Sequence, residues 1–332
     1  MDNKKERVKY SSDDKKELEK LLRKIEGEEQ VYSIALFDIL GFSNFVENNG
    51  NQVVLDLYEK LVELINKQRS TIAGEASFAG SVVPMRVSDD WKSGVLIAGA
   101  NGFINVCHFS DTFIIYMNYH IEKGGFWLQD KKDEPYPLLL GELGTAYSPI
   151  IYEKHHLYLS FLRTCMEFFC QSIIAGIPLR GCISTGFALM DSHKSIYFGD
   201  PLVEAARGEA VQNAIGIAFG KSFNNYHPVY NDYFMPYKEH IKENDNASFL
   251  SPMVPDWARY WRENPDYKDY VFSEVIEKMN REPRFSSYYD NAIKFFDFSE
   301  KHQDWACEIN RDGIVGITDY YERIRAWYKS VV

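Results

Sequence analysis

The sequence has few cysteines and fewer basic than acidic residues. Its five cysteines, at positions 107, 165, 170, 182 and 307, leave one unpaired in any disulfide scheme, and no two of them form a Cys-x-x-Cys metal pair. We therefore expect a reduced, cytoplasmic protein. The 37 Lys and Arg against 48 Asp and Glu give a formal net charge of -11. This balance argues against nonspecific binding of a nucleic-acid duplex, because such binding depends on neutralising phosphates.

Long apolar runs are also absent. Residues 1–30 are charged throughout without the apolar core of a signal peptide, and no stretch of about 18 apolar residues occurs in the chain. We expect no export and no membrane insertion. Aromatic residues, in contrast, are plentiful, with 22 Tyr and 22 Phe available for packing or for stacking on a base. The length of 332 residues suits one large domain with a helical extension.

The apolar pattern predicts alternating strands and helices in the first two thirds of the chain. We expect strands at 31–39, 104–109, 112–119, 179–187 and 195–198, and helices at 51–68, 154–175 and 201–219. Two stretches without a sustained period, 70–102 and 120–150, are interpreted as insertions. The order of elements predicts an α+β, ferredoxin-like (split βαβ) domain over residues 31–223, with an antiparallel sheet and helices on one face.

Both ends of the chain lie outside this predicted domain. Residues 1–30 are expected to form an N-terminal helical arm. Residues 224–332 are polar and rich in Tyr and Trp, and we expect a mainly helical C-terminal extension, with helices around Trp257, over 270–280 and over 318–330.

Two acidic residues stand where predicted strands end. Asp38 closes the apolar run 31–39 and is soon followed by Gly41, whereas Asp111 lies in the short turn between two predicted strands. The split βαβ order places these strand ends side by side. Two carboxylates suit Mg²⁺ or Mn²⁺, and the backbone carbonyl of Ile39 would add a ligand. The alternative is that both aspartates only cap turn amides.

Four blocks of sequence resemble the class III nucleotide cyclases. Residues 37–43, FDILGFS, resemble the family's first metal block, and residues 109–111, FSD, resemble its metal-binding hairpin. Residues 179–186, LRGCISTG, resemble a characteristic strand, and residues 199–207, GDPLVEAAR, resemble the start of the helix that follows. The blocks occur in the family's order, so the resemblance covers residues 31–219 and leaves both ends outside it.

This resemblance implies cyclisation of a nucleoside triphosphate with two divalent ions, Mn²⁺ or Mg²⁺, in each site. Asp38, Ile39 and Asp111 would be the metal ligands, and Arg207 would stabilise charge on the α-phosphate. In this family that arginine comes from the partner subunit, so a homodimer with the site at its interface is expected. The alternative for Arg207 is an ordinary surface arginine.

Three positions depart from the family pattern. Val203 replaces an Asn that orients the ribose, and Cys107 and Ile196 stand where purine cyclases read the base through hydrogen bonds. The large side chains of Tyr197 and Phe198 would narrow the base pocket toward a smaller pyrimidine, or they would simply pack in the core. The residues expected to bind the nucleotide are Phe37, Gly41, Phe42, Cys107, Ile196 and Tyr197.

The altered base-reading positions, the divergent block FDILGF at 37–42 and the ending VEAAR at 203–207 together resemble the bacterial pyrimidine cyclases of Pycsar antiphage defence. Those enzymes make cyclic UMP or cyclic CMP for a separate effector protein. The resemblance implies conversion of UTP to 3′,5′-cyclic UMP and pyrophosphate, with a downstream effector that senses the product. CTP is the alternative substrate, followed by a purine nucleotide. The rival outside the enzymes is a noncatalytic cyclase-like regulator that binds a nucleotide.

Overall fold

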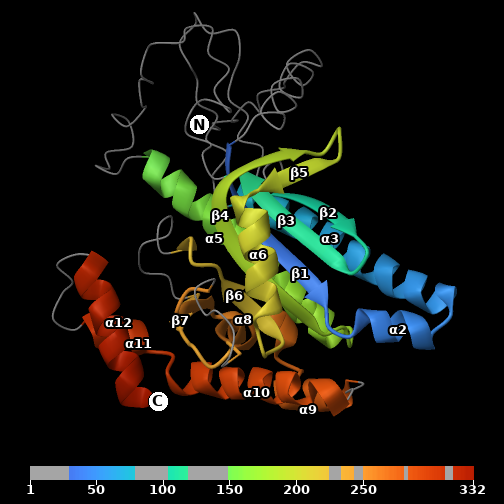
Figure 1. Cartoon of the computed structure of the whole chain (residues 1–332). Helices are drawn as coiled ribbons and strands as arrows, with labels where there is room; N and C mark the ends of the chain where they lie inside the picture. Colours follow the sequence, from blue (N-terminus) through green and yellow to red (C-terminus); the bar gives the residue numbers. More distant parts are fainter. Residues whose placement is uncertain are drawn as a thin grey trace, which may run out of the picture.

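The computed structural model of the chain, drawn in Figure 1, describes residues 30–78, 104–118, 149–223, 233–242, 250–279, 283–310 and 317–332. The expected N-terminal helix and most of the two expected insertions lie outside these ranges. Within them, none of the helices has the length and apolarity needed to cross a membrane.

A six-stranded sheet forms the centre of the molecule. Its strands are β1 (Gln30–Ile39), β2 (Ile104–Phe109), β3 (Thr112–Asn118), β4 (Leu179–Asp191), β5 (Ile196–Gly199) and β6 (Gly216–Phe219). They lie in the order β2-β3-β1-β4-β5, and β6 pairs with β4. All neighbours are antiparallel except β4 and β6. Because β3 lies between β1 and β2, which run in the same direction, the predicted split βαβ order is confirmed for the strands.

Helices cover both faces of this sheet. They are α2 (Phe42–Asn48), α3 (Asn51–Phe78), α5 (Pro149–Ile174) and α6 (Asp200–Ala210). On one face Ala35 and Phe37 of β1 pack with α3 and α5, and on the other Ile34 and Leu36 pack with Ala205 of α6. Figure 1 shows α6 lying across the sheet opposite α5. The expectation of helices on one face is therefore wrong, because the residues of β1 are apolar in both directions.

Two helices differ in length from the prediction. Helix α3 continues to Phe78 and so extends into the expected insertion 70–102. Helix α6 ends at Ala210, where a helix to Phe219 was predicted, and the apolar residues after it form the buried strand β6. The prediction failed because a short apolar run that is buried on both sides shows no repeat of polar residues. Its sequence therefore does not distinguish a helix from a strand.

The C-terminal region is helical around a small two-stranded sheet. It contains β7 (Phe234–Pro236), β8 (Met253–Pro255), α8 (Trp257–Glu263), η4 (Pro265–Tyr267), α9 (Phe272–Lys278), η5 (Pro283–Phe285), α10 (Ser286–Lys301), α11 (Trp305–Asn310) and α12 (Ile317–Val331). The three predicted helices are present, whereas α10, α11 and the small sheet were not predicted. The Trp257 ring lies 4.9 Å from Phe169 of α5 and 5.0 Å from Phe295 of α10, between ring centroids, so this region shares a core with the main sheet.

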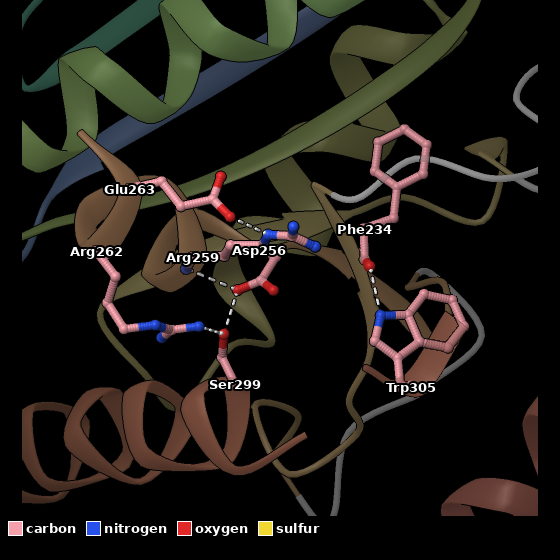
Figure 2. A network of polar contacts seen from close by, with 7 residues as sticks. All are labelled: Phe234, Asp256, Arg259, Arg262, Glu263, Ser299 and Trp305. Carbon is pink, nitrogen blue, oxygen red and sulfur yellow. Dashed lines mark hydrogen bonds and ion pairs between the residues drawn. The ribbon is translucent and has the colours of Figure 1, made fainter. Parts of the chain in front are cut away.

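Polar contacts join α8 to α10, as Figure 2 shows. The Ser299 hydroxyl of α10 donates to the Asp256 carboxylate at the start of α8 over 2.5 Å, and Arg262 donates to the Ser299 oxygen over 2.9 Å. Nearby, the Trp305 indole donates to the Phe234 carbonyl over 3.1 Å. Asp256 is almost completely buried, so these partners replace the water that its carboxylate loses on folding.

Candidate metal and nucleotide site

Asp38 and Asp111 come together at the C-terminal end of β1. Asp111 lies in the two-residue turn between β2 and β3, which Ser110 enters with a φ of 50°. The Ile39 amide next to Asp38 donates to the Asp111 carbonyl over 3.3 Å. Asp38 is paired in register with Thr112, the residue after Asp111, and the negative charge of Asp111 is close enough to raise the pKa of Asp38. The structure thus brings together the two acidic residues that the sequence analysis paired.

The electrostatics of this pair favour a cation. Burial and the neighbouring Asp111 carboxylate raise the pKa of Asp38 to about 6, against the opposing effect of Arg180. A divalent ion would relieve the repulsion between the two carboxylates, and oxygen donors of this kind suit Mg²⁺ and Mn²⁺. In the described ranges no three or more His, Cys, Asp or Glu side chains gather into a possible metal site. The pair would therefore need further oxygens, such as the Ile39 carbonyl and phosphate groups.

Arg180 and Glu209 adjoin the aspartate pair. Arg180 lies opposite Asp38 in the β1–β4 register, and its Nη2 is 3.4 Å from Asp38 Oδ2. The same nitrogen forms an ion pair with Glu209 on the buried side of α6. Burial raises the pKa of Glu209 to about 7, although Arg180 opposes this shift. The sequence analysis missed Glu209, which stands two residues beyond the last family-like block.

The turn after β1 is formed by Gly41 and Phe42, whereas Phe37 before it lies in the core. Gly41 has a φ of 81°, a left-handed conformation that suits glycine, and Phe42 then begins α2 and packs edge-on against Tyr58. Phe37 was expected to bind the nucleotide, but its side chain is completely buried on the α5 face, 5.3 Å from the ring of Phe168. Phe37 thus supports the site from the core.

The positions expected to read the base lie partly together. Cys107 and Tyr197 both pack against the same cluster on the α6 face of the sheet, and Tyr197 is close enough to influence the pKa of the Cys107 thiol. Burial raises the pKa of the Cys107 thiol to about 11, so it stays protonated near neutral pH. The Ile196 side chain is 43% exposed, and its neighbour Tyr197 is the residue that meets Cys107. The ring of Tyr197 also lies 6.3 Å from that of Tyr116.

Helix α6 has a buried and an exposed side. Gly199 precedes it with a φ of 147°, and a Cβ there would lie 2.5 Å from the Ala188 backbone, so the turn from β5 into α6 requires glycine. Val203 and Arg207, one helical turn apart, lie on the exposed side, whereas Glu209 faces the sheet. Arg207 is thus presented outward and does not belong to the buried group around Asp38.

Comparisons with known proteins identify no close relative. No family model matches the chain, and no curated protein matches its sequence. Among solved structures, a bacterial light-regulated adenylyl cyclase is similar over 76% of this chain and 99% of its own, with 13% sequence identity and a TM-score of 0.37. A likeness of this size carries no argument about function, which has to come from the residues of the site.

Proposed function

We propose that the chain is a nucleotide cyclase that converts UTP to 3′,5′-cyclic UMP and pyrophosphate. The observation that carries this proposal is the meeting of Asp38 and Asp111 at the end of β1. Further support comes from the four family-like blocks, because the end of β1, the β2–β3 turn, β4 and the start of α6 are the elements in which they lie.

In the proposed reaction the ribose 3′-oxygen bonds to the α-phosphorus and the bond from that phosphorus to pyrophosphate breaks. The hydroxyl proton leaves to solvent. Two divalent ions, when bound, would activate the hydroxyl and neutralise the departing pyrophosphate. Asp38, Asp111 and the Ile39 carbonyl would hold them, and their positions on paired backbone segments restrict their movement.

Arg207 would act on the nucleotide bound to a second copy of the chain. A planar guanidinium suits the charge that develops on the α-phosphate in the transition state. The exposed position of Arg207 on α6 supports this role, because the residue is directed away from the Asp38 group of its own chain. The active unit in this proposal is a homodimer with the site at its interface.

The choice of a pyrimidine rests on the base-reading positions. Cys107, which stays protonated and packs in the same cluster as Tyr197, stands where purine cyclases read their base with a charged side chain. The half-buried Tyr197 ring beside it would reduce the room for a purine. CTP is the second candidate substrate, since uracil and cytosine differ at one ring position. The cyclic product would be sensed by a separate effector protein, as in Pycsar defence.

The test offers UTP, CTP, ATP and GTP separately to the purified chain with Mn²⁺ and identifies cyclic products by mass spectrometry. Cyclic UMP as the main product is expected. If cyclic CMP or a cyclic purine nucleotide were the main product, the proposed cyclase activity would stand and the proposed substrate would change. If none of the four nucleotides gave a product, the noncatalytic regulator would be favoured. The presence of Val203 in place of the ribose-orienting Asn supports that alternative.

A further inference from the structure

One nitrogen atom of Arg180 serves two carboxylates. Its Nη2 is in close ion-pair contact with Glu209 and lies 3.4 Å from Asp38 Oδ2, near the limit of a hydrogen bond. The side chains are 13% exposed for Arg180, 22% for Asp38 and 10% for Glu209. In so buried a group each charge acts strongly on the others. Glu209 is the closer of the two partners of the guanidinium.

Three separate elements fix this arrangement. Arg180 stands on β4 directly opposite Asp38 of β1, so it remains beside that carboxylate. Glu209 approaches from α6, and the Tyr288 ring of α10 lies 5.5 Å from the guanidinium carbon. The carbonyl of Tyr288 is itself held, because it accepts from the Ile215 amide over 3.2 Å. The guanidinium is thus held from the side of α6 and from the side of the C-terminal helices.

A guanidinium close to Asp38 competes with a metal ion for the same carboxylate. We propose that Glu209 is a positioning residue: by holding the Arg180 guanidinium at its own carboxylate, it keeps Asp38 open to a divalent cation. The inference rests on the proposed function, in which Asp38 is a metal ligand. Residues that only orient metal ligands commonly change metal affinity by about 10–100-fold when they are removed.

The competing explanation is that the Arg180–Glu209 pair only fastens α6 to β4. The two explanations differ in what a second substitution does. If Glu209 restrains Arg180, the loss of Glu209 lets the guanidinium move onto Asp38, and the further loss of Arg180 removes that competitor. If the ion pair only stabilises the packing of α6 on β4, the second substitution cannot restore the affinity of the site for the metal ion.

The experiment measures Mn²⁺ binding to the full chain without nucleotide, from the electron paramagnetic resonance signal of free Mn²⁺. Glu209→Gln should weaken binding by about tenfold or more, and Glu209→Gln combined with Arg180→Gln should return it to within about threefold of the wild type. Glu204→Gln is the matched control, because Glu204 lies on the same helix and accepts from the Ser222 amide over 2.8 Å. It should leave Mn²⁺ affinity unchanged.

Wild-type affinity in folded Glu209→Gln, or no recovery in the double variant, would overturn the inference. If Glu209→Gln does not fold, Glu209→Asp replaces it, since the shorter acid withdraws from Arg180 and should weaken Mn²⁺ binding in the same direction. Asp38→Asn separates the two proposals. If it binds Mn²⁺ as the wild type does, the metal assignment of the proposed function fails and this inference fails with it. If it binds more weakly while Glu209→Gln does not, only this inference fails.

Discussion

The Ile39 amide donates to the Asp111 carbonyl, and this backbone contact holds the β2–β3 turn against the end of β1. It places the Asp38 and Asp111 carboxylates near each other. Such a pair is costly for the folded chain, because burial and mutual repulsion both disfavour two negative charges. In the proposed function, a bound divalent cation would relieve this cost.

Substitution of the site carboxylates should abolish activity without unfolding the chain. Asp38→Asn and Asp111→Asn are expected to abolish cyclisation. Asp38→Asn should nevertheless raise the stability of the metal-free chain by about 1–2 kcal/mol, because the cost of burying the Asp38 charge and its repulsion by Asp111 both disappear. Turnover assays and thermal unfolding without metal measure the two effects. Asp56→Asn, at an exposed position of α3, is the control for both. Full activity in both site variants would refute the metal assignment.

Mixed dimers test whether two chains share one site. Arg207→Ala should lower turnover by about 100–1000-fold, the usual loss when a group that stabilises transition-state charge is removed, without loss of fold. Mixing it with Asp38→Asn chains should restore part of the activity, since one of the two sites in each mixed dimer then has both Asp38 and Arg207. Activity is measured after the chains are exchanged. A mixture as inactive as its components would contradict a shared site.

Much of this arrangement could be predicted from the sequence, because it depends on local signals. The apolar runs that end at Asp38 and surround Asp111 predict strands, and the order of elements predicts that β3 pairs with β1. The glycine after β1 predicts the turn that Gly41 makes with its positive φ.

The remainder depends on contacts that no local pattern specifies. Residues 216–219 read as the end of a helix, and only pairing with β4 makes them a strand. Glu209 becomes part of the site because α6 packs on the sheet face that carries Arg180. The place of Tyr288 beside Arg180 depends in the same way on how α10 packs. Tertiary packing, which the sequence pattern does not encode residue by residue, decides all three.

Substitution of Tyr197 should change which base is accepted. Its half-buried ring meets Cys107, so Tyr197→Ala should enlarge the proposed base pocket and shift the ratio of kcat/KM for UTP over ATP by about tenfold toward ATP. Phe198→Ala is the matched control, because the neighbouring Phe198 side chain is 57% exposed and points outward. Steady-state kinetics with both nucleotides give the ratio. An equal shift in the two variants would assign Tyr197 to packing alone.

The buried His240 makes a prediction about acid stability. It is 5% exposed, stacks on Tyr237 and borders a cavity of about 10 Å³ with Trp257 among its walls. Burial lowers the pKa of His240 from 6.5 to about 3, so the imidazole is neutral in the folded chain at all but strongly acid pH.

Because the pKa of His240 is lower in the folded than in the unfolded chain, its contribution to stability is complete above pH 6.5 and is lost as the pH falls toward 3. At pH 5 the loss of stability should be about 2 kcal/mol, since only the unfolded chain takes up the proton.

His240→Asn cannot take up that proton. It should therefore lose less stability between pH 7.5 and pH 5 than the wild type, whatever its stability at pH 7.5. Urea unfolding at both pH values measures the difference, and His193→Asn, at an exposed turn, should keep the wild-type loss. Equal losses in His240→Asn and the wild type would mean that the imidazole of His240 is protonated in the folded chain.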